Sequence, residues 1–185
     1  AGAAMATEVL AAGYRNIVLL RSDQQADQRQ DSRFAGFTST LAASGVPVLG
    51  QVCYRGASSV PKGRSLAEQA LAQWPEADFL YCTNDMIAAG ALFGLQAAGR
   101  QVPGQMGLAG FSGLDLLEGL GTRIATTHVN RRSIGQHAAR MILARLSGAA
   151  PGLRHEMHPS VDPGDTLRPQ PVSPATNRVG TTITS

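Results

Sequence analysis

The segment DFLYCTND (residues 78–85) indicates the fold, because a short apolar run passes through a polar turn directly into a helical pattern. Residues 78–82 have the length and composition of a buried strand, and residues 86–98 follow as a helix that Gly99 ends. A strand, a short loop and a helix in this order form the repeating unit of a parallel sheet with helices on its faces.

The same unit recurs on both sides of this segment. We expect further helices at 4–12, 32–44, 62–74 and 131–146, and further strands at 16–20, 46–54, 106–111, 124–129 and 154–159. The sequence therefore predicts an α/β fold with a doubly wound parallel sheet. Residues 168–185 are rich in Pro, Thr and Ser, and we expect an irregular tail there.

The composition narrows the possible functions. Hydrophobic residues make up 43% of the 185 residues, as in a globular chain, and no apolar run reaches the roughly 20 residues that a membrane-spanning helix needs. The net charge of +3 comes from scattered arginines, whereas a DNA-binding domain usually carries a basic stripe. Cys53 and Cys82 fit no metal-ligand spacing, and two buried, reduced thiols indicate a cytoplasmic protein.

Three loops follow the carboxyl ends of expected strands, which is where open parallel sheets bind ligands. They contribute Arg33, the pair Asn84 and Asp85, and Ser112. An arginine offers a planar set of donors to hydroxyls or a carboxylate, and an asparagine amide can both donate and accept. Taken alone, Asn84 or Asp85 more commonly caps the helix that follows, and Ser112 alone is uninformative.

Motifs of enzymes and metal sites are missing from the sequence. There is no phosphate-binding glycine loop, and GFSG (residues 110–113) is one residue short of the nucleophile elbow of hydrolases. His155 and His158 lie in an expected extended segment, where their side chains diverge. We therefore expect no catalytic residue, no metal and no cofactor.

Six short patterns together resemble the sensor domains of the lactose- and galactose-repressor family (LacI/GalR). They are GYRNIVLL (13–20), RFAGF (33–37), TNDMIAAGA (83–91), GRQVP (99–103), AGF (109–111), and TT (126–127) with IG (134–135) and AA (138–139). Their order and spacing agree with the family over residues 1–167. The gluconate-repressor branch is the most similar, because of Ser58 and Ser59 before Gly63 and the run ALFG (91–94).

The resemblance implies a two-lobed fold of the periplasmic-binding-protein-like type I, with an effector between the lobes. Residues 1–125 would form most of the C-terminal lobe. Residues 126–147 would cross to the N-terminal lobe, residues 148–167 would return as a strand, and residues 168–185 would be the tail. The helix-turn-helix head that binds DNA in this family would be absent from this chain.

The resemblance also implies the site and the partners. The effector contacts would be Arg33, Ser58, Asn84, Asp85 and Ser112. Some members have an aromatic residue near the position of Ser58, and many have an aspartate at that of Ser112. The effector would be a sugar or a sugar acid. Because a serine neither repels an anion nor accepts as strongly as a carboxylate, and Arg33 is kept, a sugar acid or another anionic metabolite is favoured over a neutral sugar.

A homodimer through the helix at 86–98 is also expected, with Met86, Phe93 and small residues at the contact, although Phe93 fits equally well against the chain's own sheet. DNA would be bound only through the absent head, in the cytoplasm.

The expected function is thus the effector-sensing domain of a bacterial DNA-binding repressor, in which the ligand shifts the lobe arrangement and so the operator affinity. A periplasmic sugar-binding protein of a transporter is the alternative with the same fold. The Asn-Asp, G-x-x-V-P and Thr-Thr patterns favour the repressor. An enzyme of the same architecture is the third possibility, and no set of residues predicts it.

Overall fold

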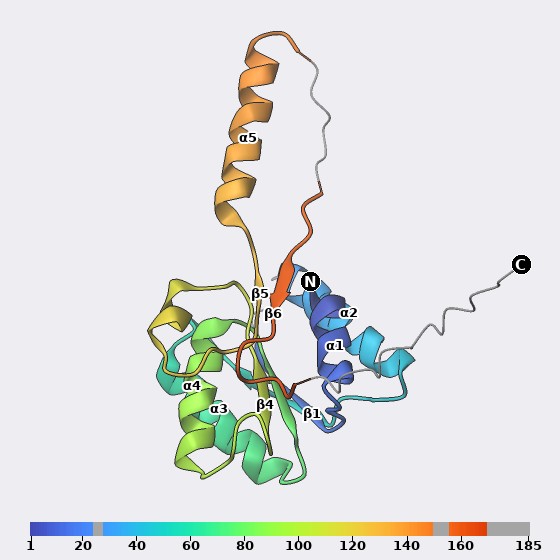
Figure 1. Cartoon of the computed structure of the whole chain (residues 1–185), viewed down its shortest axis with the longest axis vertical. Coiled ribbons are helices and arrows are strands. Elements are labelled where there is room, and N and C mark those ends of the chain that lie inside the picture. The colour runs from blue at the N-terminus through green and yellow to red at the C-terminus, as the bar shows by residue number, and fades with distance from the viewer. Residues whose placement is uncertain (24–27, 150–155, 170–185) are drawn as a thin grey trace, which may run out of the picture.

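The computed structural model describes residues 1–23, 28–149 and 156–169. Its centre is a parallel sheet in the order β2-β1-β3-β4, with β1 at Ile17–Ser22, β2 at Gly50–Tyr54, β3 at Phe79–Cys82 and β4 at Gly107–Ala109. Helices α1 (Gly2–Ala11) and α2 (Gln28–Ala43) cover one face, and α3 (Val60–Gln73) and α4 (Asp85–Ala97) cover the other (Figure 1). The predicted doubly wound α/β fold is confirmed.

Both faces of the sheet are buried, which explains why its central strands are continuously apolar. Along β1, Val18 and Leu20 pack with α3 and α4, whereas Ile17 and Leu19 pack with α1 and α2. Tyr81 of β3 is fully buried on the α2 side, where its ring stacks on Phe37 with centroids 3.9 Å apart.

Helices α3 and α4 cross very closely because glycines stand at the contact. A Cβ atom added to Gly90 would lie 2.0 Å from the carbonyl oxygen of Val60, and one added to Gly63 would lie 2.2 Å from that of Ile87. The small residues of α4 that we expected at a contact between two chains are therefore used inside this chain. Phe93 is nevertheless 42% exposed, so it does not pack against the chain's own sheet.

Beyond β4 the chain forms a short 3-10 helix, η1 (Asp115–Gly119), and then runs beside the end of β4 before it leaves the body of the molecule. Strand β5 (Thr126–His128) leads into α5 (Arg131–Leu146), and β6 (Ser160–Asp162) pairs with β5 in an antiparallel direction. Figure 1 shows α5 projecting away from the sheet, and none of its residues is buried. The division of the chain into lobes at residues 125, 147 and 167 stays a prediction.

Several details differ from the expectations. Strand β2 begins at Gly50 rather than at residue 46, and α2 begins at Gln28 rather than at residue 32. Cys82 is buried, but Cys53 is exposed, because β2 is an edge strand whose burial alternates. The last strand was expected at residues 154–159, but the last strand that the structure describes is β6, which begins at Ser160. Residues 154 and 155 of the expected strand lie outside the described residues. The expected tail is described only as far as residue 169. None of the helices within the described ranges combines the length and the apolar composition of a membrane-spanning segment.

Candidate functional site

A pocket of about 1030 Å³ lies at the carboxyl ends of all four strands of the parallel sheet. Ser22 and Tyr54 end β1 and β2 and line it, as do residues that follow β3 and β4. The carboxyl edge of the sheet was the predicted place for a ligand, because there the strand ends leave a crevice between the helices.

Arg33 reaches this pocket from α2 and is held there by two contacts. Its Nη2 donates a hydrogen bond of 2.9 Å to the carbonyl oxygen of Thr83, and its guanidinium carbon lies 3.8 Å from the centroid of the Phe111 ring. Stacking and hydrogen bonding fix the plane of the guanidinium before any ligand arrives. A ligand that uses this group therefore orders little of the side chain on binding.

Asn84 both caps α4 and lines the pocket, so the two roles weighed for it are compatible. Its Oδ1 accepts a 3.1 Å hydrogen bond from the Ile87 amide, and its Nδ2 donates to Ser58 Oγ at 2.7 Å. Ser58 Oγ also lies 2.8 Å from the Tyr54 hydroxyl. Because the cap occupies the carbonyl end of the side chain, Asn84 presents its amide donor to this side of the pocket.

Ser112 lines the pocket with a backbone that serine rarely adopts. Its φ of 120° lies in the region that favours glycine. Neighbouring strand β5 imposes it, because the Ser112 amide donates to the Thr127 carbonyl at 3.0 Å and the Ser112 carbonyl accepts from the Val129 amide at 3.4 Å. A strained residue at a pocket wall is typical of functional sites.

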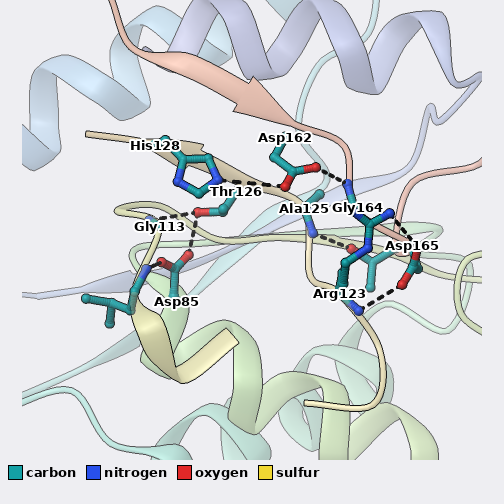
Figure 2. A network of polar contacts seen from close by, with 11 residues as sticks. Asp85, Gly113, Arg123, Ala125, Thr126, His128, Asp162, Gly164 and Asp165 are labelled. Atoms are coloured by element: carbon teal, nitrogen blue, oxygen red, sulfur yellow. Dashed lines mark hydrogen bonds and ion pairs between the residues drawn. The ribbon is translucent and has the colours of Figure 1, made fainter. Parts of the chain in front are cut away.

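Asp85 does not line the pocket, although it follows Asn84 directly. It is fully buried, its Oδ1 accepts a 2.6 Å hydrogen bond from Thr126 Oγ1, and its Oδ2 accepts a 2.8 Å bond from the Leu114 amide (Figure 2). Burial raises the pKa of Asp85, and these hydrogen bonds oppose the rise. The structure thus brings Arg33, Ser58, Asn84 and Ser112 together and places Asp85 behind the wall.

Several lining residues were not anticipated from the sequence, among them Ser22, Arg29, Tyr54, Phe111 and Arg131. Phe111 could have been inferred from the sequence, because it is the last residue of an expected strand and stands directly before Ser112. Arg131 could not have been inferred from the sequence. It is the first residue of α5, and it reaches the pocket only because β5 runs beside the Ser112 turn.

The charged side chains of the pocket wall are all basic. Three arginines line it, at 29, 33 and 131, and no aspartate or glutamate does so in the part of the chain that the structure describes. Burial raises the pKa of Tyr54, so its hydroxyl stays a neutral group there. Among the described residues no cluster of three or more His, Cys, Asp or Glu side chains could hold a metal ion, and His158 is exposed.

Known proteins resemble this chain over most of its length. Residues 6–167 match the family described as periplasmic binding protein-like domain. The HTH-type transcriptional regulator GntR of Escherichia coli (strain K12) is 33% identical over 144 residues, which are 78% of this chain and 43% of that protein.

Two solved structures share the fold. A LacI-family transcriptional regulator from Silicibacter pomeroyi gives a TM-score of 0.87 with 42% identity, covering 91% of this chain and 51% of that one. The transcription regulator GntR from Chromobacterium violaceum gives a TM-score of 0.83 with 30% identity, over 90% and 62%. The predicted resemblance is confirmed, and the chain spans about half the length of these relatives.

Proposed function

The chain belongs to the family of periplasmic binding protein-like domains, and from this premise we propose that it is the effector-sensing part of a DNA-binding transcription repressor whose effector is a sugar acid. The observation that carries the proposal is the pocket at the carboxyl edge of the sheet, which three arginines line without a described carboxylate. Such a wall favours an anion over a neutral sugar of the same size.

The proposed contacts follow from the chemistry of the lining residues. Arg33 suits the carboxylate of the ligand, since a fixed guanidinium gives charge-assisted, paired hydrogen bonds to it. Asn84, Ser58 and Ser112 suit the hydroxyl groups, because small amide and hydroxyl side chains can adapt to donors and acceptors on a sugar chain.

The proposed response is a shift between two arrangements of the protein. Arg131, the first residue of α5, lines the pocket together with Arg33 and Ser112 of the body. An anion that binds both parts favours the arrangement in which they are close. In a repressor this arrangement changes operator affinity through a DNA-binding part outside this chain.

The remaining parts of the proposal are the assembly and the location. Exposure of Phe93 on α4 supports a homodimer through that helix, with the half-buried Met86 beside the contact. A repressor acts where the chromosome is, so the proposal includes the cytoplasm. The relatives are named as transcription regulators, which favours this function over a transporter's binding protein or an enzyme.

A thermal-shift comparison on the whole gene product tests the proposal. D-gluconate and D-glucitol share a six-carbon polyhydroxyl chain and differ in the carboxylate. We expect D-gluconate to raise the melting temperature, because a ligand of the native state stabilises it, and D-glucitol to have little effect. Arg33→Gln should abolish the rise, whereas Arg64→Gln, on the exposed surface of α3, should keep it. Equal shifts for both compounds would contradict the proposed ligand class, and a shift that survives Arg33→Gln would contradict the proposed contact with Arg33.

A further inference from the structure

The turn that carries Ser112 is tied to α4 by the carboxylate of Asp85. Asp85 is the first residue of α4, and its amide donates to the Phe111 carbonyl at 3.1 Å while its Oδ2 accepts from the Leu114 amide at 2.8 Å. Asp85 therefore holds the residues on both sides of Ser112. Gly110 allows this approach, since an added Cβ there would lie 2.4 Å from Asp85 Oδ1.

Thr126 joins the same carboxylate to strand β5. Its Oγ1 donates to Asp85 Oδ1 at 2.6 Å and accepts from the Gly113 amide at 3.3 Å (Figure 2). Asp85 forms no ion pair with another described residue, so these donors from the turn and from β5 compensate the buried charge. Because a buried carboxylate strongly requires such donors, the turn cannot move without a large cost.

The conformation of the turn is strained, so it depends on the side-chain bonds of Asp85 and Thr126 together with the backbone bonds between Ser112 and the segment of β5. Ser112 has a φ of 120°, which costs free energy for any residue but glycine, and Gly113 follows with a φ of 64°. An added Cβ at Gly113 would lie 2.1 Å from Nδ1 of His128, so the turn is pressed against β5. A strained turn persists only where its surroundings determine it.

We propose that Asp85 and Thr126 are positioning residues that set Ser112 in the pocket wall and couple the wall to β5, the strand that leads into α5. Neither residue lines the pocket, so neither contacts a ligand there. Loss of either bond lets the turn adopt other conformations, and the apparent ligand affinity falls in proportion to the fraction of molecules in which the turn keeps the conformation described here. The effect on affinity rests on the proposed function, whereas the effect on the turn does not.

The chain offers two matched controls among its buried threonines. Thr127 stands next to Thr126 and is fully buried, but its Oγ1 has no hydrogen-bond partner in the described part of the chain. Thr166 is fully buried away from the pocket wall, where its Oγ1 accepts from the Ala125 amide and donates to the Leu108 carbonyl. Thr127→Val removes a hydroxyl without a partner, and Thr166→Val removes a bonded one that does not hold the turn.

The test uses the whole gene product with Asp85→Asn, Thr126→Val and Thr126→Ser beside the two controls. Hydrogen exchange of the Gly113 and Leu114 amides is measured without ligand. Asp85→Asn and Thr126→Val should speed it about tenfold, because the local opening becomes easier. Thr126→Ser keeps the hydroxyl and should restore protection. Thr127→Val should leave it unchanged, and so should Thr166→Val even though it lowers the melting temperature.

Titration with D-gluconate, well below every melting temperature, then tests the coupling. We expect Kd to rise about fivefold or more in Asp85→Asn and Thr126→Val and to stay unchanged in Thr127→Val, Thr166→Val and Thr126→Ser. Unchanged amide protection in Asp85→Asn and Thr126→Val would overturn the positioning role. Faster exchange with unchanged Kd would overturn the coupling to the pocket. If the wild-type protein binds no D-gluconate, the proposed ligand class fails, and amide exchange still decides the role of Asp85.

Discussion

Tyr81→Phe is expected to stabilise the protein, although it removes a polar group from the centre of the sheet. The Tyr81 hydroxyl is buried and has no hydrogen-bond partner in the described part of the chain. An unsatisfied buried hydroxyl costs about 1–3 kcal/mol, so its removal should raise the free energy of unfolding by about 1 kcal/mol at pH 7. For a domain of this size, that change corresponds to a rise in melting temperature of about 2–4 °C. Phe37, which stacks on the ring, loses nothing by the substitution.

The same substitution changes the response to alkali. Burial raises the pKa of Tyr81 above its ordinary value near 10 in the folded chain. Above pH 10 the unfolded chain has released this proton while the folded chain keeps it, so the unfolded state binds fewer protons and stability falls as pH rises. One such group contributes a slope of about 1.4 kcal/mol per pH unit. The gain from Tyr81→Phe should therefore widen between pH 10 and the raised pKa of the folded state.

Urea unfolding at pH 7 and at steps between pH 9 and 11 measures both effects. Tyr14→Phe is the matched control, because the Tyr14 hydroxyl donates to the Pro103 carbonyl and accepts from the Arg168 amide, each at 3.1 Å. That variant should lose stability at pH 7 by about 1–2 kcal/mol. A Tyr81→Phe protein that is less stable than wild type at pH 7 would refute the reasoning, since the hydroxyl must then have a favourable partner.

Three further predictions concern α4. Asn84→Asp keeps an oxygen for the helix cap but replaces the amide donor to Ser58 with a carboxylate. The melting temperature should therefore change little, while calorimetry should show a D-gluconate affinity at least tenfold lower. A large loss of stability with unchanged affinity would contradict this prediction. Gly90→Ala should lower the free energy of unfolding, measured with urea, by about 3 kcal/mol, and Gly94→Ala should lower it less. The reason is that an added Cβ would lie 2.0 Å from its nearest neighbour at Gly90 but 3.0 Å from it at Gly94. A larger loss for Gly94→Ala than for Gly90→Ala would contradict the close crossing of α3 and α4. Phe93→Glu should shift sedimentation from dimer to monomer, and an unchanged dimer would exclude this face of α4.

The end of β3 shows how far the sequence could predict the site. A polar pair directly after an apolar strand marks the carboxyl edge of the sheet, and Asn84 lies there as expected. Which of the two adjacent residues faces the pocket depends on how the first turn of α4 packs against β5. The Asp85 carboxylate accepts a hydrogen bond from Thr126, which is 41 positions away in the sequence, and no local sequence pattern predicts that pairing.

The sequence also could not show where a strand stands in the sheet or how a turn is bent. Cys53 lies in an apolar run like that of Cys82, but β2 is an edge strand and alternate residues of it stay exposed. Ser112 carries no signal for a positive φ, as a glycine would, because backbone bonds to β5 impose the conformation. In both cases a neighbouring strand decides, and strand order comes from tertiary packing.

A crystal structure of the whole gene product with D-gluconate tests the proposed pocket most directly. We expect the ligand at the carboxyl edge of the parallel sheet, with its carboxylate within hydrogen-bond distance of the Arg33 guanidinium and its hydroxyl groups facing Asn84 and Ser112. A ligand bound elsewhere, or one whose carboxylate points away from the arginines, would contradict the assignment of this pocket as a sensor of anionic sugars.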